Sequence, residues 1–203
     1  MSEPEFRPAL PNDCAHLALL ADMATRCLSS HLWSLTATAG QSAFEVGRSI
    51  IRNDTLHFSH FRNWRVAEFD GDVVGAINTC LLPPSISAPQ TPSLTPSHNL
   101  PDVTRGLNEL KALAAGTCYL SSAALYPEHQ ARGFGSALID EAMSQARGSG
   151  AGQLTLLVGS FNTRAHRLYL RCGFEEWARR PFNAFPGSDS PGEWVLMRKT
   201  MPT

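Results

Sequence analysis

The stretch Gln130-Ala-Arg-Gly-Phe-Gly135 lies between two segments of different periodicity. The residues before it, 118–125, are predicted to form a strand, and residues 134–147 repeat apolar side chains at helical spacing. Gly133 and Gly135 lack a Cβ, so the backbone can turn tightly there and approach a ligand closely. The first N–H groups of the following helix have no intrahelical partner, and with the helix dipole they attract phosphate oxygens. Arg132 can add a charge-assisted contact.

The glycine spacing of this stretch excludes two familiar phosphate-binding motifs. No Lys-Ser/Thr pair follows, as a P-loop requires, and Leu138 stands where the dinucleotide-binding fingerprint has its third glycine. Taken alone, the stretch fits an ordinary strand–helix turn as well as it fits a phosphate site.

A second motif, Asn162-Thr-Arg-Ala-His-Arg-Leu-Tyr-Leu-Arg-Cys-Gly-Phe174, follows a near-continuous apolar strand at 154–158. Asn162 is a suitable helix N-cap. Ala165, Leu168, Tyr169 and Cys172 recur at helical spacing, so Tyr169 is expected to face the sheet rather than solvent. A core tyrosine whose hydroxyl bonds to the backbone would produce the same pattern.

Together the two motifs resemble the GNAT superfamily of acetyl-CoA-dependent N-acetyltransferases. The first resembles the family's Q/R-x-x-G-x-G/A pyrophosphate loop, and the second resembles its N-x-x-A-x-x-x-Y-x-x-x-GF ending. The resemblance extends from about residue 119 to residue 174. It implies an α/β fold with a central mixed, strongly twisted sheet of six to seven strands flanked by helices.

The resemblance also implies acetyl-CoA as cosubstrate, no metal, and a set of site residues. Backbone groups at the strand end would bind the pantetheine arm, the loop and helix start would hold the pyrophosphate, and Tyr169 would be the general acid for the leaving thiolate. The implied cofactor-binding residues are Ala123, Ala124, Leu125, Gln130, Ala131, Arg132, Gly133, Phe134, Gly135, Ser136 and Asn162.

The general base has no clear place in the sequence. Many relatives carry a Glu on or near the fifth strand, but residues 154–160 contain no acid. Glu68 is the best alternative by position, although a solvated charge in a hairpin would look the same. A chain of water molecules is another route for the proton.

The rest of the chain reads as strands and helices around these motifs. We expect a short edge strand at 6–10, a helix capped by Asn12 or Asp13 whose apolar face runs from Leu17 to Leu28, and a second helix at 42–51. Asp70-Gly71 predicts a hairpin between strands 64–69 and 73–80. A helix at 104–114 and strands at 175–180 and 194–199 complete the prediction.

Composition indicates one folded domain spanning residues 1–203. Residues 83–101 contain six prolines among Ser and Thr and are predicted to form a surface loop. The 17 Lys and Arg against 18 Asp and Glu disfavour binding to nucleic acid or an anionic membrane. No apolar run is long enough for a membrane span, and no secretion signal begins the chain, so we expect a cytoplasmic protein. The five cysteines and seven histidines show no metal-ligand spacing.

The function expected from the resemblance is transfer of the acetyl group of acetyl-CoA to a primary amine by direct attack in a ternary complex. The acceptor is a small-molecule amine or a protein amine, and Arg179 and Arg180 are candidates for receiving an acidic one. A homodimer is compatible with the fold, because the last strands offer an edge. The alternative is a non-catalytic acyl-CoA-binding regulatory module, which the missing fifth-strand acid favours and Tyr169 disfavours.

Overall fold

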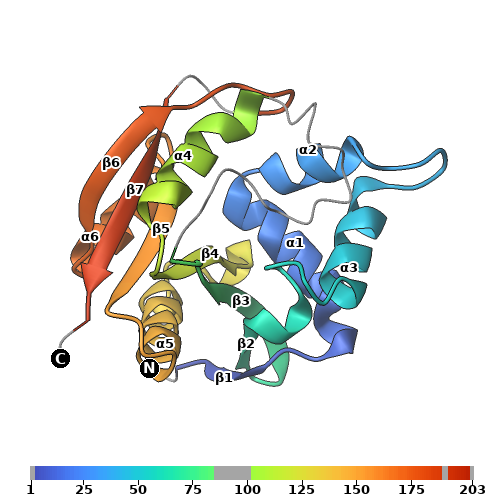
Figure 1. Cartoon of the computed structure of the whole chain (residues 1–203). Coiled ribbons are helices and arrows are strands. Elements are labelled where there is room, and N and C mark those ends of the chain that lie inside the picture. Colours follow the sequence, from blue (N-terminus) through green and yellow to red (C-terminus); the bar gives the residue numbers. More distant parts are fainter. Residues whose placement is uncertain (1–2, 85–101, 189–191, 202–203) are drawn as a thin grey trace. The chain divides into compact units, whose positions relative to one another are not determined.

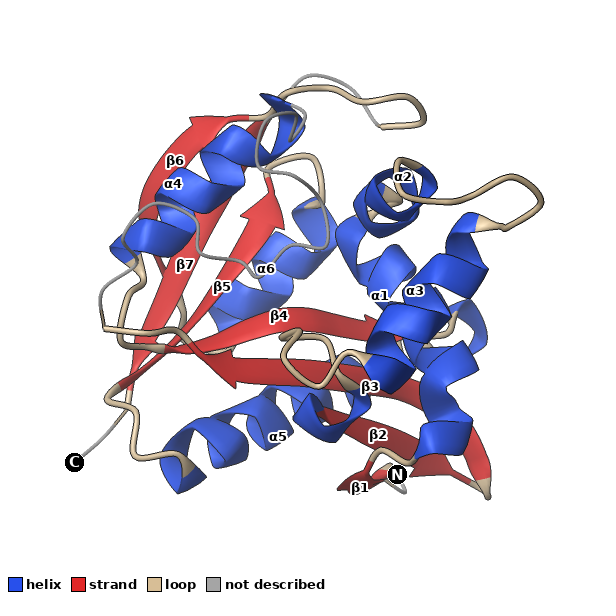
Figure 2. Ribbon diagram, turned by 45° about the vertical axis from the view of Figure 1, so that its right-hand side comes forward, coloured by secondary structure: helices blue, strands red, loops and turns tan. Residues whose placement is uncertain are grey.

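The computed structural model describes residues 3–84, 102–188 and 192–201 (Figure 1). The proline-rich loop predicted at about 83–101 therefore falls, apart from its first two residues, outside the described residues. The strands follow the hydrogen-bonding order β1-β2-β3-β4-β5-β7-β6. β4 and β5 are parallel, whereas β1–β2, β2–β3, β5–β7 and β6–β7 are antiparallel. The predicted α/β fold with a mixed sheet and flanking helices is confirmed (Figure 2).

The chain forms two compact units, and residues far apart in sequence contribute to each. The first contains Met1–Thr79 and Ser122–Glu141, and the second contains Cys80–Ser121 and Ala142–Thr203. The elements wholly or mostly in the first unit are β1 (Glu5–Pro8), α1 (Cys14–Thr25), α2 (Leu28–Ser34), α3 (Ala43–Asn53), β2 (Trp64–Phe69) and β3 (Asp72–Leu81).

Two elements run through both units, namely β4 (Cys118–Leu125) and α5 (Phe134–Gly148). The elements of the second unit are α4 (Arg105–Leu113), β5 (Gln153–Gly159), α6 (Thr163–Arg171), β6 (Glu175–Pro181) and β7 (Glu193–Thr200). Apart from α1 and α2, these bounds agree with the predicted strands and helices to within a few residues. β1 is an edge strand, as Pro8 predicts.

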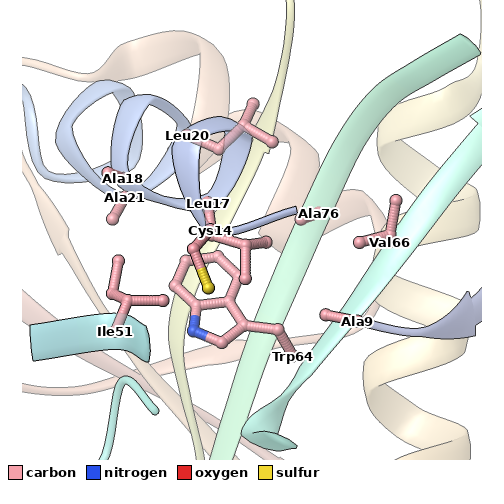
Figure 3. Packing of buried hydrophobic residues seen from close by; sticks show 10 residues of the cluster. All are labelled: Ala9, Cys14, Leu17, Ala18, Leu20, Ala21, Ile51, Trp64, Val66 and Ala76. Atoms are coloured by element: carbon pink, nitrogen blue, oxygen red, sulfur yellow. The ribbon is translucent and has the colours of Figure 1, made fainter. Parts of the chain in front are cut away.

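The core of the first unit is built around Trp64 (Figure 3). Its side chain is 1% exposed, and its indole N–H donates to the carbonyl of Ser59 at 2.8 Å. Leu17 and Cys14 of α1 and Ile51 of α3 are fully buried in the same cluster. Each large apolar side chain buried in this way contributes about 1.5–3 kcal/mol, so the cluster holds the helices on β2 and β3.

The predicted single helix face through Leu28 is wrong. The chain leaves α1 at Arg26 and Cys27, both with positive φ (51° and 69°), and α2 starts again at Leu28. Asp22 stabilises this turn, because its carbonyl accepts from the Cys27 N–H and its carboxylate accepts from the Ser30 N–H at 2.7 Å. A local hydrogen-bonded turn therefore interrupts an apolar repeat that continues in the sequence.

α3 begins with a capping box at Ser42 and Glu45. The Ser42 hydroxyl accepts from the Glu45 N–H at 3.2 Å, and the Glu45 carboxylate accepts from the Ser42 N–H at 2.7 Å. Each side chain thus satisfies a backbone donor that the helix leaves unpaired. Asp13 occupies the N-cap position of α1, as predicted, but its carboxylate binds Leu10 N–H and Arg7 instead of a helix donor.

Ser42→Ala is expected to lower the free energy of unfolding by about 1 kcal/mol, the usual cost of removing a helix cap. Urea unfolding followed by circular dichroism measures this loss. Ser49→Ala is the matched control, because Ser49 is exposed on the same helix and its hydroxyl accepts from the Asn53 side chain at 3.2 Å instead of from a backbone N–H. Equal stability of the two variants would show that the box does not hold the start of α3.

In the second unit, α4 packs against β6 and β7, and α6 packs against β5 (Figure 1). A Cβ on Gly106 of α4 would lie 3.7 Å from Trp194 Cδ1, whereas the Lys199 ammonium donates to the carbonyl of Cys172 at the end of α6. Trp194 and Lys199 are five residues apart on one strand, so their side chains point to opposite faces.

No helix within the described residues is long and apolar enough to cross a membrane.

Candidate active site

The loop between β4 and α5 has the backbone conformation that its glycines predict. Gly133 has φ +88°, and Ala131 is also left-handed with φ +62°. The Gln130 side-chain amide donates to the carbonyl of Leu125 at 3.0 Å and so ties the loop to the end of β4. These features fix a tight turn directly in front of α5.

This turn exposes a run of backbone donors. Among the described residues, the N–H groups of Ala131 to Gly135 donate to no backbone carbonyl, and the first paired one is that of Ser136, which donates to Gly133. A Cβ on Gly133 would meet no atom within 4 Å, so the space beside the turn is open. Successive free N–H groups at a helix start form a concave site for an anion.

Arg132 lies against two aromatic rings beside this loop. Its guanidinium carbon is 4.7 Å from the ring centroid of Phe69 and 5.0 Å from that of Phe134. These ring contacts hold the guanidinium of Arg132 beside the turn, and neither of them involves a carboxylate. Its predicted contact with a phosphate stays a prediction.

Asn162 caps α6, as predicted. Its side-chain oxygen accepts from the Ala165 N–H at 3.3 Å, which orients the first turn of the helix that carries Tyr169. The predicted contact of Asn162 with a ligand is untested.

Tyr169 is half-buried and packs against Phe174, with 5.8 Å between the ring centroids. Burial raises the pKa of Tyr169 to about 12, and the nearby Cys172 thiol adds to the shift. Over the part of the chain that the structure describes, its hydroxyl has no hydrogen-bond partner. The contacts of Tyr169 with the described residues therefore do not support the alternative of a core tyrosine whose hydroxyl bonds to the backbone.

All three tyrosines of the chain are expected to titrate above their ordinary pKa of about 10. Burial raises the pKa of Tyr119, Tyr126 and Tyr169 in the folded protein. For Tyr169 the linked stability is therefore fully present below about pH 10 and is lost as the pH rises towards 12. Tyrosinate absorbance should show no full step near pH 10 in the native protein, but one in denaturant. A native step of one tyrosine near pH 10 would contradict these environments.

Glu68 lies in an ion-pair network at the edge of β2. Its carboxylate is 2.8 Å from the guanidinium of Arg7, which also binds Asp13 at 2.7 Å. Arg7 and Glu68 both belong to the first unit, and the Glu68 side chain is partly exposed. The structure therefore gives Glu68 a structural partner that its sequence position did not indicate.

Arg179 and Arg180, the candidates for an acidic acceptor, are paired with carboxylates. Arg179 binds Glu176 and Glu193, and Arg180 binds Glu109 of α4, each at 2.7 Å. These are exposed ion pairs that join α4, β6 and β7, so neither guanidinium is freely available to an acceptor.

The predicted site residues are distributed over both units. Ala123–Leu125 and the loop residues 130–136 belong to the first, whereas Asn162 and Tyr169 belong to the second. Sequence reasoning missed a cluster of Lys111, Cys80 and Tyr119 in the second unit, because these residues stand on three separate elements. No group of three or more metal-ligating side chains occurs among the described residues.

Comparison with known proteins identifies the family of the chain. A model of the acetyltransferase (GNAT) family matches residues 30–174. A phosphinothricin acetyltransferase from Sinorhizobium meliloti, solved in complex with AcCoA, has TM-score 0.63 and 15% identity, over 98% of this chain and 89% of that chain. The yncA protein of Salmonella typhimurium, solved with its cofactor acetyl-CoA, has TM-score 0.59 and 17% identity, over 100% and 96%.

A third similar structure is the ribosomal-protein-alanine N-acetyltransferase from Brucella melitensis. It has TM-score 0.59 and 19% identity, over 97% of this chain and 99% of that chain. At these identities the structural matches show a shared fold. No curated protein matches the chain by sequence.

Proposed function

Because the chain belongs to the GNAT family of acetyltransferases, we propose that it transfers the acetyl group of acetyl-CoA to a primary amine by direct attack in a ternary complex. The observation that carries this proposal is the loop at 131–135, whose N–H donors are free and whose Gly133 side is open. Two solved structures of the same fold contain acetyl-CoA, which supports the same cosubstrate here.

The loop fits a pyrophosphate on chemical grounds. Backbone N–H groups of Ala131 to Gly135 would donate to the phosphate oxygens, and the N-terminal dipole of α5 would favour their negative charge. Gly133 leaves room for this close approach. Ala123, Ala124 and Leu125 would present backbone groups to the pantetheine arm, and Asn162 would contact it from its place before α6.

The thioester supplies an activated acyl group, so the protein's task is to orient the amine and manage two protons. Holding the amine close to the thioester carbonyl can lower the barrier by several kcal/mol. Tyr169 would donate a proton to the leaving thiolate, because its phenol is the protonated form at neutral pH. Burial raises the pKa of Tyr169 to about 12, which keeps the phenol protonated and also makes it a weaker acid.

Glu68 stays the candidate for the general base. The Arg7 guanidinium lies 2.8 Å from the Glu68 carboxylate, so a base role would require this carboxylate to accept a proton while it is paired with Arg7. The base role is therefore a prediction that a substitution must test.

Glu68→Gln is expected to lower the turnover number at least about tenfold, the effect of losing a modest general base, with acetyl-CoA affinity retained. Glu141→Gln is the matched control, because Glu141 makes a similar 2.8 Å pair with Arg65 away from the loop. Turnover of Glu68→Gln equal to that of the control would remove Glu68 from the mechanism and leave a water chain as the route for the proton.

The acceptor class is open between small-molecule and protein amines. The solved structures named above include a phosphinothricin acetyltransferase and a ribosomal-protein-alanine N-acetyltransferase, so they do not distinguish between these two acceptor classes. A single domain, a cytoplasmic location and a homodimer likewise stay predictions.

The proposal is tested by incubating the protein with acetyl-CoA and a panel of small amines and peptides bearing free N-termini or lysines. We expect mass spectrometry to find an acetyl group on at least one amine, and none in samples lacking the protein. If acetyl-CoA binds in calorimetry but no amine is acetylated, the proposal gives way to an acyl-CoA-binding regulatory module.

A further inference from the structure

The indole N–H of Trp194 on β7 is a buried donor without an acceptor. It makes no hydrogen bond to any described residue, although the side chain is only 7% exposed. By contrast, Trp64 in the first unit is 1% exposed and donates its N–H to the Ser59 carbonyl at 2.8 Å. A buried donor left unpaired destabilises the fold, so such exceptions call for an explanation. A ligand oxygen that accepts from Trp194 would provide one.

Trp194 belongs to a cluster of aromatic rings in the second unit. The ring centroid of Phe182 lies 4.9 Å from that of Phe161 and 5.1 Å from that of Trp194. Phe182 and Trp194 are buried, whereas Phe161 is partly exposed. Small-molecule sites are commonly lined by apolar and aromatic side chains with a few polar groups that fix the ligand's orientation. This cluster combines a partly exposed ring with an unpaired donor.

The segment that carries Phe161 is fixed to the start of β7. The Ser160 N–H donates to the Glu193 carbonyl at 2.8 Å, and the Glu193 N–H donates to the Ser160 hydroxyl at 3.0 Å. The Phe161 ring lies so close to Gly159 that a Cβ there would collide with it. Because these contacts order the ring before a ligand arrives, less conformational entropy is lost on binding.

The aromatic cluster adjoins residues of the candidate active site. Phe161 directly precedes Asn162, the N-cap of α6, and the Asn162 N–H donates to the Gly159 carbonyl at 2.8 Å. The same helix carries Tyr169, and all of these residues belong to the second unit. Asn162 is proposed to contact the pantetheine arm, so an acceptor held on Phe161 would be one residue along the chain from that contact.

The first turn of α4 lies against the edge of the indole. A Cβ on Gly106 would be 3.7 Å from Trp194 Cδ1, the ring atom bonded to the indole nitrogen, and 2.9 Å from the Pro181 carbonyl oxygen. Farther along α4, Glu109 pairs with Arg180 of β6 at 2.7 Å, and both side chains are exposed. Exposed ion pairs of this kind add little stability. A shift of this turn would therefore open the indole N–H to a ligand.

We propose that Phe161, Phe182 and Trp194 form the acceptor site, which selects a primary amine that carries an aromatic group and a carbonyl oxygen. This inference rests on the proposed function and narrows its acceptor. The aromatic group packs on Phe161, and the carbonyl oxygen accepts from the Trp194 N–H once the first turn of α4 moves aside. Phenylalaninamide has this chemistry, and so does the N-terminus of a peptide that begins with phenylalanine.

The test compares the kinetics of phenylalaninamide with those of phenethylamine, which lacks the carbonyl, and alaninamide, which lacks the ring. We expect phenylalaninamide to have the highest kcat/KM of the three. Trp194→Phe should raise its KM about fivefold, the effect of losing one neutral hydrogen bond. The KM of phenethylamine, the kcat values and the acetyl-CoA affinity in calorimetry should not change. A short peptide with N-terminal phenylalanine, compared with phenylalaninamide, shows whether the acceptor is a protein or a small molecule.

Trp64→Phe is the matched control, because it removes an indole N–H that is paired. It should lower the urea midpoint of unfolding more than Trp194→Phe does, and leave the KM of each amine unchanged. Phe161→Leu is a second variant, which keeps both buried rings of the cluster. It should reduce the preference for phenylalaninamide over alaninamide.

The outcomes separate this inference from the proposed function. Equal KM changes for phenylalaninamide and phenethylamine in Trp194→Phe, or no preference for phenylalaninamide in protein that acetylates another amine, would overturn the inference alone. A loss of stability in Trp194→Phe as large as that in Trp64→Phe would show that the N–H is already bonded, for example to water, and would also contradict it. Protein that binds acetyl-CoA but acetylates no amine would overturn the proposed function and the inference with it.

Discussion

Gly133→Glu is expected to weaken acetyl-CoA binding about 100-fold, or about 2.7 kcal/mol. A glutamate there would place a negative charge among the N–H donors of Ala131 to Gly135, where the pyrophosphate is proposed to bind. Like charges at a binding surface cost several kcal/mol. The side chain has open space around it, so the loss would come from charge and bulk in the site. Isothermal titration calorimetry with acetyl-CoA measures the change.

Gly150→Glu is the matched control for this variant. Gly150 also has positive φ (+72°), is exposed, and would place a Cβ within 4 Å of no atom, but it lies at the other end of α5. Both substitutions force a glutamate into left-handed backbone, at a cost of about 1–2 kcal/mol in stability. Both variants should therefore lose similar stability, while only Gly133→Glu loses affinity. Unchanged affinity in Gly133→Glu would remove the loop from the acetyl-CoA site.

Tyr169→Phe is expected to lower the turnover number about 100-fold or more, the range for loss of a general acid. The Tyr169 hydroxyl makes no hydrogen bond to any described residue, so its removal should leave folding intact. The ring itself still packs against Phe174. Initial rates of thiol release at saturating acetyl-CoA and amine measure the effect.

Two further measurements decide what a loss in Tyr169→Phe means. Acetyl-CoA affinity and the urea midpoint of unfolding should both match the wild type, because the variant removes only the hydroxyl proton donor. A fall in turnover that comes with an equal fall in stability would indicate a structural role. Turnover equal to wild type would show that Tyr169 is not the acid.

The elements that the sequence predicted well are those specified by neighbouring residues. Asp70-Gly71 between two alternating apolar runs predicts the β2–β3 hairpin, and Gly133 predicts the left-handed turn before α5. Asn162 predicts the cap of α6 in the same way. In each case the cause lies within a few residues of its effect.

The features that sequence reasoning missed depend on partners far along the chain or on unusual backbone. Arg7 meets Glu68 across 61 residues, and no pattern around Glu68 indicates that pair. Lys111 meets Tyr119 only because α4 folds back over β4. The break between α1 and α2 depends on positive φ at Arg26 and Cys27, and neither position carries a glycine that would predict it.

Initial-rate kinetics of thiol release from acetyl-CoA, with amine and acetyl-CoA both varied, test the central claim most directly. The account predicts release that requires the amine, with intersecting double-reciprocal lines as expected for a ternary complex, and a rate that falls in Tyr169→Phe. Tight binding of acetyl-CoA with no amine-dependent release of thiol would contradict acetyl transfer. Parallel lines would contradict direct attack and indicate an acetylated intermediate of the protein.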